Sequence, residues 1–275
     1  MDRLIAQIES GAIEGGPQFE ALLPMWFEWL IDRTPPMASL MPVYKAFIEG
    51  LFAFNQLGDS ELELIRRTTV HLLRGGPKPD QYKDHLDRLI DIFQEVRSPN
   101  ALDWGLDISD ALSCHPCRDT DARQRWLSVL VAAALQHRDR LTTAQLTLLR
   151  LIARDACIDL GPQLERAEST PGAELPSGLR ILIYSLDEQA NQRAALTLQD
   201  VLTTCRIDVN ADQSCSKRLH NAAKNADVVA FVSSVATHAA FFCIKDAISS
   251  SDVLLQVPGS GTSRIVQSVL SQVTQ

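Results

Sequence analysis

Four short predicted strands alternate with helical segments over residues 179–275, and this alternation restricts the possible folds more than any other feature. Three of these runs are largely apolar, LRILIYSL (179–186), DVVAFVSS (227–234) and DVLLQVP (252–258), and the more polar RIDVNAD (206–212) can be a short strand. After each run, apolar residues recur at helical spacing, up to the last segment at 262–273. Strands that alternate with helices in this way build a parallel sheet with helices on both faces. We therefore predict a small Rossmann-like α/β domain over residues 179–275.

The residues before 166 show only helical spacing. In QFEALLPMWFEWLIDR (18–33) the apolar positions form one stripe, interrupted by Pro24. Ser60 and Glu63 have the spacing of a capping box, and so do Thr142 and Gln145. No repeat of fixed period is visible, which favours an irregular bundle or degenerate helical hairpins. The fold class expected is therefore α plus α/β: a helical domain over 1–165, a linker rich in Pro, Gly, Ser and Glu over 166–178, and the Rossmann-like domain.

Charge and hydropathy narrow the classes of partner and location. The formal net charge of −8 argues against non-specific binding of nucleic acid, because such binding depends on positive side chains that neutralise phosphates. No apolar run is long enough for a membrane-spanning helix, and the start MDRLIAQIESG lacks a signal-peptide core. We expect a cytoplasmic protein that makes no membrane contact.

Six cysteines are scattered along the chain and do not resemble a secreted disulfide framework. Only SCHPC, with Cys114, His115 and Cys117, is closely spaced. We interpret it as a turn between helices with reduced thiols; metal or redox chemistry is the alternative, with His85 or Cys157 completing a site in space. No metal is predicted, and Cys243, between two apolar residues, is expected to pack in the core.

Hydroxyl groups and glycines gather where the predicted strands end. Ligands of open parallel sheets bind beyond the carboxyl ends of the strands. In GSGTSR (259–264) the glycines permit a close backbone approach, and the following helix offers free N–H groups to an anion. These features suit a phosphate, a carboxylate or a nucleotide, although plain turn chemistry explains the same residues, and no Walker motif is present. The predicted ligand-binding residues are Ser185, Ser233, Ser234, Thr237, His238, Gly259, Ser260, Gly261, Thr262, Ser263 and Arg264.

Catalysis has only weak candidates. His238 is expected to open a helix, where it could serve as a general base with Asp187 as its orienting group. Asp246 is a further candidate, although it and Lys245 are expected to lie on the surface. No hydrolase signature such as GxSxG is present.

The segment ADVVAFVSSVATHAAFFCIKDAI, followed by a strand and GSGTSRIVQSVL, resembles the bacterial family called domain of unknown function 2325. The matching positions are Thr237, His238, Lys245, Gly259, Gly261, Thr262 and Ser263. The resemblance covers about residues 179–275 and implies a Rossmann-like domain attached to varied partner domains, including in mobile or defence gene clusters.

The same region is similar to the TIR domain. Ser234, Phe242, Cys243 and Asp246 fall at the offsets of its SxxxxxxxWCxxE region, and LRILIYSLDE is similar to its first strand. Phenylalanine replaces the family's tryptophan, and aspartate replaces the glutamate that cleaves NAD. The glycine-bearing loop after the second strand is missing.

These observations lead to one favoured function and two alternatives. We favour a non-enzymatic adaptor or ligand-sensing protein, whose helical domain binds proteins and whose α/β domain binds a small anion or nucleotide. The resemblance implies a place in a bacterial defence or mobile-element system. The alternatives are a TIR-like NAD-cleaving or nucleotide-hydrolysing enzyme, and a structural assembly subunit with a vestigial pocket.

Overall fold

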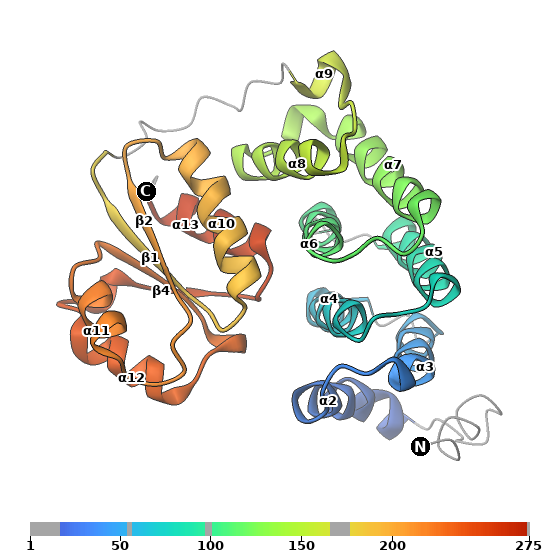
Figure 1. Ribbon diagram of the computed structural model, residues 1–275, viewed down its shortest axis with the longest axis horizontal. Coiled ribbons are helices and arrows are strands. Elements are labelled where there is room, and N and C mark those ends of the chain that lie inside the picture. The colour runs from blue at the N-terminus through green and yellow to red at the C-terminus, as the bar shows by residue number, and fades with distance from the viewer. Residues whose placement is uncertain (1–16, 54–56, 97–100, 166–176, 274–275) are drawn as a thin grey trace. The chain divides into compact units, whose positions relative to one another are not determined.

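A computed structural model describes residues 17–53, 57–96, 101–165 and 177–273 (Figure 1). The chain divides into two compact units, Met1–Ala133 and Ala134–Gln275. Most of the predicted linker, residues 166–176, lies outside the described residues, and the domain limits proposed at 165 and 179 stay a prediction. Within the described residues no helix is long and apolar enough to cross a membrane.

The described part of the first unit is helical. Its α-helices are α2 (Pro17–Arg33), α3 (Met41–Ala53), α4 (Asp59–Arg74), α5 (Pro79–Glu95), α6 (Ala101–Ser113) and α7 (Thr120–Gln136), whose last residues reach into the second unit, and η1 (Ala38–Leu40) is a short 3-10 helix. Helix α2 continues through Pro24. Helix α4 begins after Gly58, which makes no side-chain cap, and Glu63 binds Arg66. The capping box predicted at Ser60 and Glu63 is therefore wrong.

Three aromatic rings from successive helices form a packing centre of this unit. The ring centroids of Phe93, Trp104 and Trp126 lie 5.7–6.2 Å apart, a separation typical of favourable aromatic pairs. Both indole N–H groups are satisfied: Trp104 donates to the Leu62 carbonyl and Trp126 to the Ser109 hydroxyl, each at 2.8 Å. The cluster ties α4, α5, α6 and α7 together.

The second unit contains a four-stranded parallel sheet. Its strands are β1 (Arg180–Tyr184), β2 (Arg206–Asn210), β3 (Val228–Val232) and β4 (Leu254–Val257), arranged in the order β2-β1-β3-β4. The helices between and after them are α10 (Glu188–Val201), α11 (Lys217–Lys224), α12 (His238–Ala247) and α13 (Thr262–Val273), with the short 3-10 helices η3 (Ser233–Val235) and η4 (Ser251–Val253). The predicted fold class, α plus α/β, is confirmed.

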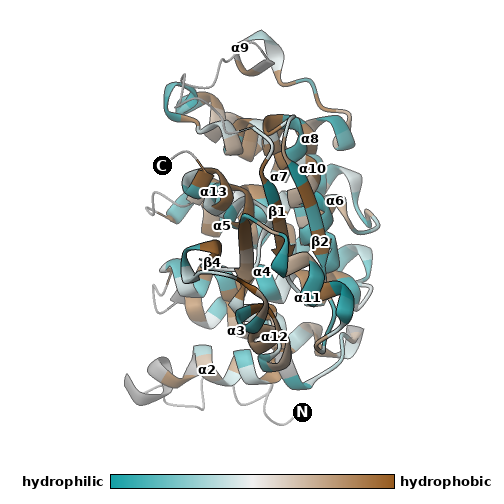
Figure 2. Ribbon diagram, turned by 90° about the vertical axis from the view of Figure 1, so that its left-hand side faces the viewer, coloured by the Kyte–Doolittle hydropathy of each residue, from teal (hydrophilic) through white to brown (hydrophobic). Residues whose placement is uncertain are grey.

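Helices cover both faces of the sheet (Figure 1). Helices α10 and α13 pack on one face, where Ile181 and Ile183 of β1 meet Val266 of α13 in one apolar cluster. Helices α11 and α12 pack on the other, around Leu182 and Phe231. Figure 2 shows apolar residues in the central strands and a largely polar sequence in α11. The buried β1 and β3 lie in the middle, which explains why their sequences are nearly continuous apolar runs.

The second unit also includes η2 (Arg138–Arg140), α8 (Thr143–Ala156) and the short α9 (Gly161–Glu165). Thr142 caps α8 in a capping box with Gln145, as predicted. Helix α8 packs against α10 and α13, where Ala144 joins their apolar cluster. On its polar side Asp155 pairs with Arg193 of α10 at 2.5 Å.

Candidate functional site at the carboxyl edge of the sheet

The parallel sheet brings the three predicted ligand-binding segments to one edge. Strands β1, β3 and β4 are neighbours and run in the same direction, so 185–187, 233–238 and 259–264 all follow their carboxyl ends. The first two segments are joined directly, because the Leu186 N–H donates to the Val235 carbonyl at 2.9 Å. Helix α10 leads to one face of the sheet and α12 to the other, so this bond spans the topological switch point between β1 and β3.

The segment after β1 is a buried turn. The fully buried Ser185 Oγ accepts from the Asp187 N–H at 3.0 Å. Asp187 is the N-cap of α10, with its carboxylate accepting from Ala190 N–H. The Asn191 amide donates to the carbonyls of Ser185 (2.8 Å) and Asn210 (3.3 Å). Among the described residues, the buried Asn191 Oδ1 has no hydrogen-bond partner.

The segment after β3 is the most accessible of the three. Ser233 and Ser234 lie in η3 and are exposed, and His238, the first residue of α12, is exposed as well. Thr237 is the N-cap of α12: its hydroxyl accepts from Ala240 N–H at 3.1 Å and donates to the Gln213 carbonyl at 2.7 Å. This threonine therefore has a structural role, and its role in ligand binding stays a prediction.

The loop after β4 is largely folded into the protein. Gly259 has φ +101°, which requires glycine there. Four of the predicted ligand-binding residues that follow it are buried, so their side chains are not presented to solvent; these are Ser260, Gly261, Thr262 and Ser263. Arg264, in the first turn of α13, is half-buried. The groups that can meet a ligand at this edge form an outer row, comprising Ser233, Ser234, Thr237, His238, Gly259 and Arg264.

The weak catalytic candidates are spread over this region. Asp246 is exposed and lies eight residues after His238 on α12, a rise of about 12 Å along the helix axis. Asp187 caps a helix of the opposite face. The predicted roles in catalysis therefore stay predictions.

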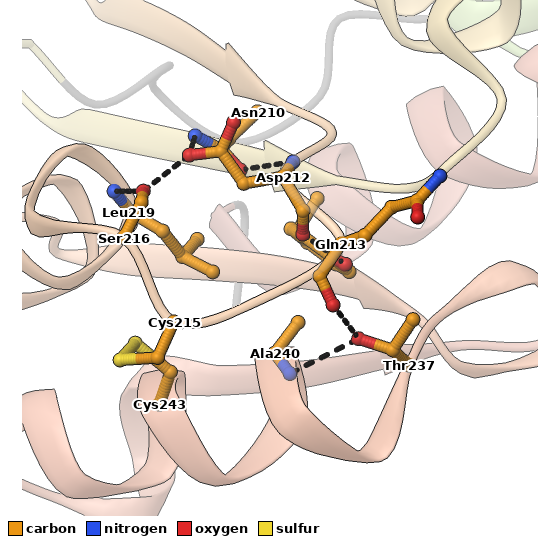
Figure 3. The surroundings of a disulfide bond; sticks show 10 residues. Asn210, Asp212, Gln213, Cys215, Ser216, Leu219, Thr237, Ala240 and Cys243 are labelled. Atoms are coloured by element: carbon orange, nitrogen blue, oxygen red, sulfur yellow. Dashed lines mark hydrogen bonds between the residues drawn. A yellow bond between two sulfur atoms is a disulfide. The ribbon is translucent and has the colours of Figure 1, made fainter.

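The loop between β2 and α11 borders the same edge, and it is not among the candidate site segments predicted from the sequence. The Asp212 carboxylate accepts from Ser216 Oγ and from Asn210 Nδ2, the second at 3.1 Å (Figure 3). These two hydrogen bonds, that from Ser216 first, lower the pKa of Asp212 below its usual value. The Tyr184 hydroxyl donates to the Asp212 carbonyl at 2.9 Å, and burial raises the pKa of this phenol. The Asn-x-Asp spacing, typical of local side-chain turns, could have revealed the loop.

The same loop carries Cys215, which forms a disulfide with Cys243 of α12 (Figure 3). This pair is not predicted from the sequence, and it forms because the crossover over β1 places the start of α11 beside α12. Cys243 is nevertheless buried in an apolar cluster, as predicted. In the described part of the chain, the group of three metal-ligating side chains close enough to share an ion is Cys215, His220 and Cys243.

SCHPC follows helix α6 as a turn. Cys114 and Cys117 are not in a disulfide, and the Nδ1 of His115 makes a hydrogen bond of 2.7 Å with the Ala111 carbonyl. His85 is buried against Thr69 and does not complete a ligand set with the two cysteines.

In the comparison with known proteins, one family model matches nearly the whole chain. A family model described as DpdD-like matches residues 2–268. The predicted relationships to domain of unknown function 2325 and to TIR domains are wrong, because the matching family is a different one and extends through both units. No curated protein and no solved structure matches the chain.

Proposed function

The chain belongs to the DpdD-like family, which suggests a DNA-modification or defence-associated system, and we propose that it acts there as a non-enzymatic adaptor. Its helical unit binds a protein partner, and the carboxyl edge of its α/β unit binds a small anionic ligand or nucleotide. One observation carries the proposal: a row of large apolar side chains exposed on α2.

The row follows one face of α2 at helical spacing. Leu22, Met25, Trp26 and Trp29 stand at positions i, i+3, i+4 and i+7, and Trp29 is 63% exposed. The other face of α2 packs against α3, since Phe27 is buried and stacks on Phe47 of α3 with ring centroids 3.5 Å apart. Exposed apolar patches mark interaction sites, and tryptophan and methionine are enriched at protein interfaces.

The occupant that fits this row is an apolar helix of a protein partner. Helices α2, α4 and α6 contact one another in succession, so this unit grows by side-by-side packing of helices. A further helix laid against the α2 row would continue the same packing. We call Leu22, Met25, Trp26 and Trp29 the α2 row.

Charge argues against DNA as the direct partner. The chain has a formal net charge of −8, and many of its guanidinium groups are neutralised by carboxylates at short distance. For example, Arg88 lies 2.5 Å from Glu49. Phosphate contacts need unpaired positive groups gathered on one surface. The pairs include Arg66–Glu63, Arg67–Glu28, Arg88–Glu49, Arg125–Asp87, Arg193–Asp155 and Arg206–Asp208.

The ligand-sensing half of the proposal depends on the outer row of the sheet edge. Helices α12 and α13 begin there, so their N-terminal N–H groups and positive dipole ends face the same edge. Arg264 and the exposed His238 supply side-chain donors for an anion. The hydroxyls of Ser260, Thr262 and Ser263 in the β4–α13 loop are buried and do not belong to this row.

The adaptor proposal is tested with the full chain and the purified proteins of the same system. Trp29→Glu places a charge in the α2 row, and Leu196→Glu is the matched control, since Leu196 is exposed on α10. We expect one of these proteins to co-elute with the chain. Trp29→Glu should weaken its binding by about 30-fold or more, as for an interface hot spot, whereas Leu196→Glu should not. Equal binding by both variants, or a dimer of the chain itself that Trp29→Glu dissociates, would contradict the proposal.

The ligand half has its own test. Thermal unfolding is followed with inorganic phosphate and with a panel of nucleotides. A ligand that binds the folded state raises the melting temperature by mass action. We expect such a rise, reduced in Arg264→Ala. If no compound raises the melting temperature, the ligand half is wrong and a structural assembly role is favoured, while the adaptor test stands independently.

A further inference from the structure

The Cys215–Cys243 pair lies beside a histidine. Cys215 is exposed in the loop before α11, Cys243 is buried on α12, and His220 is half-buried one turn into α11. In the structure the two sulfur atoms form a disulfide, with the Cα atoms 5.2 Å apart (Figure 3). The nearest ligand atoms of all three residues lie within 4.8 Å of one another.

Two thiolates and an imidazole form a ligand set typical of zinc. Zn²⁺ bonds to cysteine sulfur at about 2.3 Å and to histidine nitrogen at about 2.0 Å, so tetrahedral ligands stand about 3.5 Å apart. The spacing of the three residues approaches that arrangement once the sulfur–sulfur bond is open. We propose that reduced Cys215 and Cys243, together with His220, form a zinc site, and that the disulfide is its metal-free alternative. With three protein ligands, the fourth position is left to water or to an exogenous ligand.

The surrounding hydrogen bonds hold the two cysteines close together without their covalent bond. Ser216, next to Cys215, is the N-cap of α11 and accepts from Leu219 N–H at 3.0 Å. The Gln213 carbonyl, on the other side of Cys215, accepts from Thr237 at the start of α12. The loop is thus fastened to both helices that carry the ligands, so reduction leaves the thiols close together. A ligand set that is already organised loses less entropy on metal binding.

The two states exchange through a balanced reaction. A dithiol reductant gives two electrons and two protons to the disulfide and becomes a disulfide itself, which leaves two thiols on the protein. Zn²⁺ then binds both sulfurs as thiolates and releases the two protons. Oxidation by a disulfide reverses the sequence and expels the metal.

The test uses the full chain with Cys114, Cys117 and Cys157 replaced by serine, so that these free thiols, which are exposed or half-buried, do not contribute to the metal signal. One sample stays oxidised; the other is reduced with dithiothreitol, which is removed without oxygen. Both are titrated with Co²⁺, whose thiolate charge-transfer absorption reports sulfur ligands, and then with Zn²⁺ as competitor. His220→Ala tests the third ligand, and His137→Ala, at an exposed histidine of the same unit, is its control.

We expect the reduced chain to bind one Co²⁺ with thiolate absorption that Zn²⁺ removes, and the oxidised chain to show none. His220→Ala should weaken binding by at least about tenfold, and His137→Ala should not change it. Cys215→Ser, at an exposed position that folding tolerates, should remove much of the charge-transfer band. The proposal is overturned if the reduced chain shows no thiolate absorption, if the oxidised chain binds equally well, or if His220→Ala binds as tightly as its control.

Discussion

The buried His85 makes the stability of the helical unit depend on pH. Its Nε2 lies 3.0 Å from Thr69 Oγ1, whose own hydroxyl is directed to the Ile65 carbonyl at 2.9 Å. The threonine oxygen therefore accepts, and the neutral imidazole carries its proton on Nε2. Burial lowers the pKa of His85 from 6.5 to about 4.

The sign follows from linkage. The unfolded chain binds a proton at His85 below about pH 6.5, whereas the folded chain binds it only near pH 4, so acid favours unfolding. The stability due to this group is present above the unfolded pKa and is lost as the pH falls toward the folded one. The full loss below both pKa values is about 3 kcal/mol, of which about 2 kcal/mol falls between about pH 7 and about pH 5.

His85→Gln isolates this contribution. Glutamine does not titrate and can still donate an amide N–H to Thr69. Urea unfolding of both proteins is measured at about pH 7 and about pH 5, and we expect the wild type to lose about 2 kcal/mol more than the variant between them. His137→Gln, at an exposed histidine, should behave as the wild type. If His85→Gln loses as much stability in acid as the wild type, the argument from burial is refuted.

Three further substitutions test the packing and the backbone by urea unfolding. Gly105→Ala places a Cβ 2.8 Å from a ring carbon of Phe93 and 2.9 Å from a methyl carbon of Leu130; this overpacking should cost about 1–3 kcal/mol, and a neutral result would show that the ring can shift. Trp126→Ala removes a fully buried indole and should cost about 3–5 kcal/mol; a loss below about 1 kcal/mol would contradict its central place. Gly259→Ala forces a side chain into φ +101° and should cost about 1–3 kcal/mol, unless the β4–α13 turn rearranges.

The strands were the part of the fold most readable from sequence. Ile181–Tyr184 of β1 and Val228–Val232 of β3 are buried and are all apolar or aromatic, and only Arg180, at the exposed start of β1, is charged. β2 lies at an edge and is half-buried, which explains why RIDVN carries charges and gives a weaker pattern. Helix boundaries depend on local capping. Thr142 is the N-cap of α8 as its capping-box spacing predicts, but the N-cap of α4 is Gly58 and not Ser60.

The candidate site was only partly predictable, because burial of a loop depends on its neighbours in space. Sequence placed Ser185 and Ser260 at strand ends but could not show that both are fully buried. Cys215 and Cys243 stand 28 residues apart and meet only through the crossover of the chain over β1. Spacing along the sequence carries no signal of such a pair, since it depends on which helices share a face.

The outer row and the zinc site share Thr237, whose hydroxyl donates to the Gln213 carbonyl of the β2–α11 loop. The two proposed sites should still operate independently, because neither this bond nor Arg264 depends on the disulfide. Phe231 stacks on Tyr184 with centroids 5.4 Å apart, and the Tyr184 hydroxyl fastens the β2–α11 loop to the sheet. This anchor does not depend on the sulfur–sulfur bond, so reduction of Cys215 should leave the loop in register. Arg264, by contrast, lies at the start of α13 on the opposite face of the sheet. Metal binding should therefore be unchanged in Arg264→Ala, and a nucleotide that raises the melting temperature should do so in both redox states.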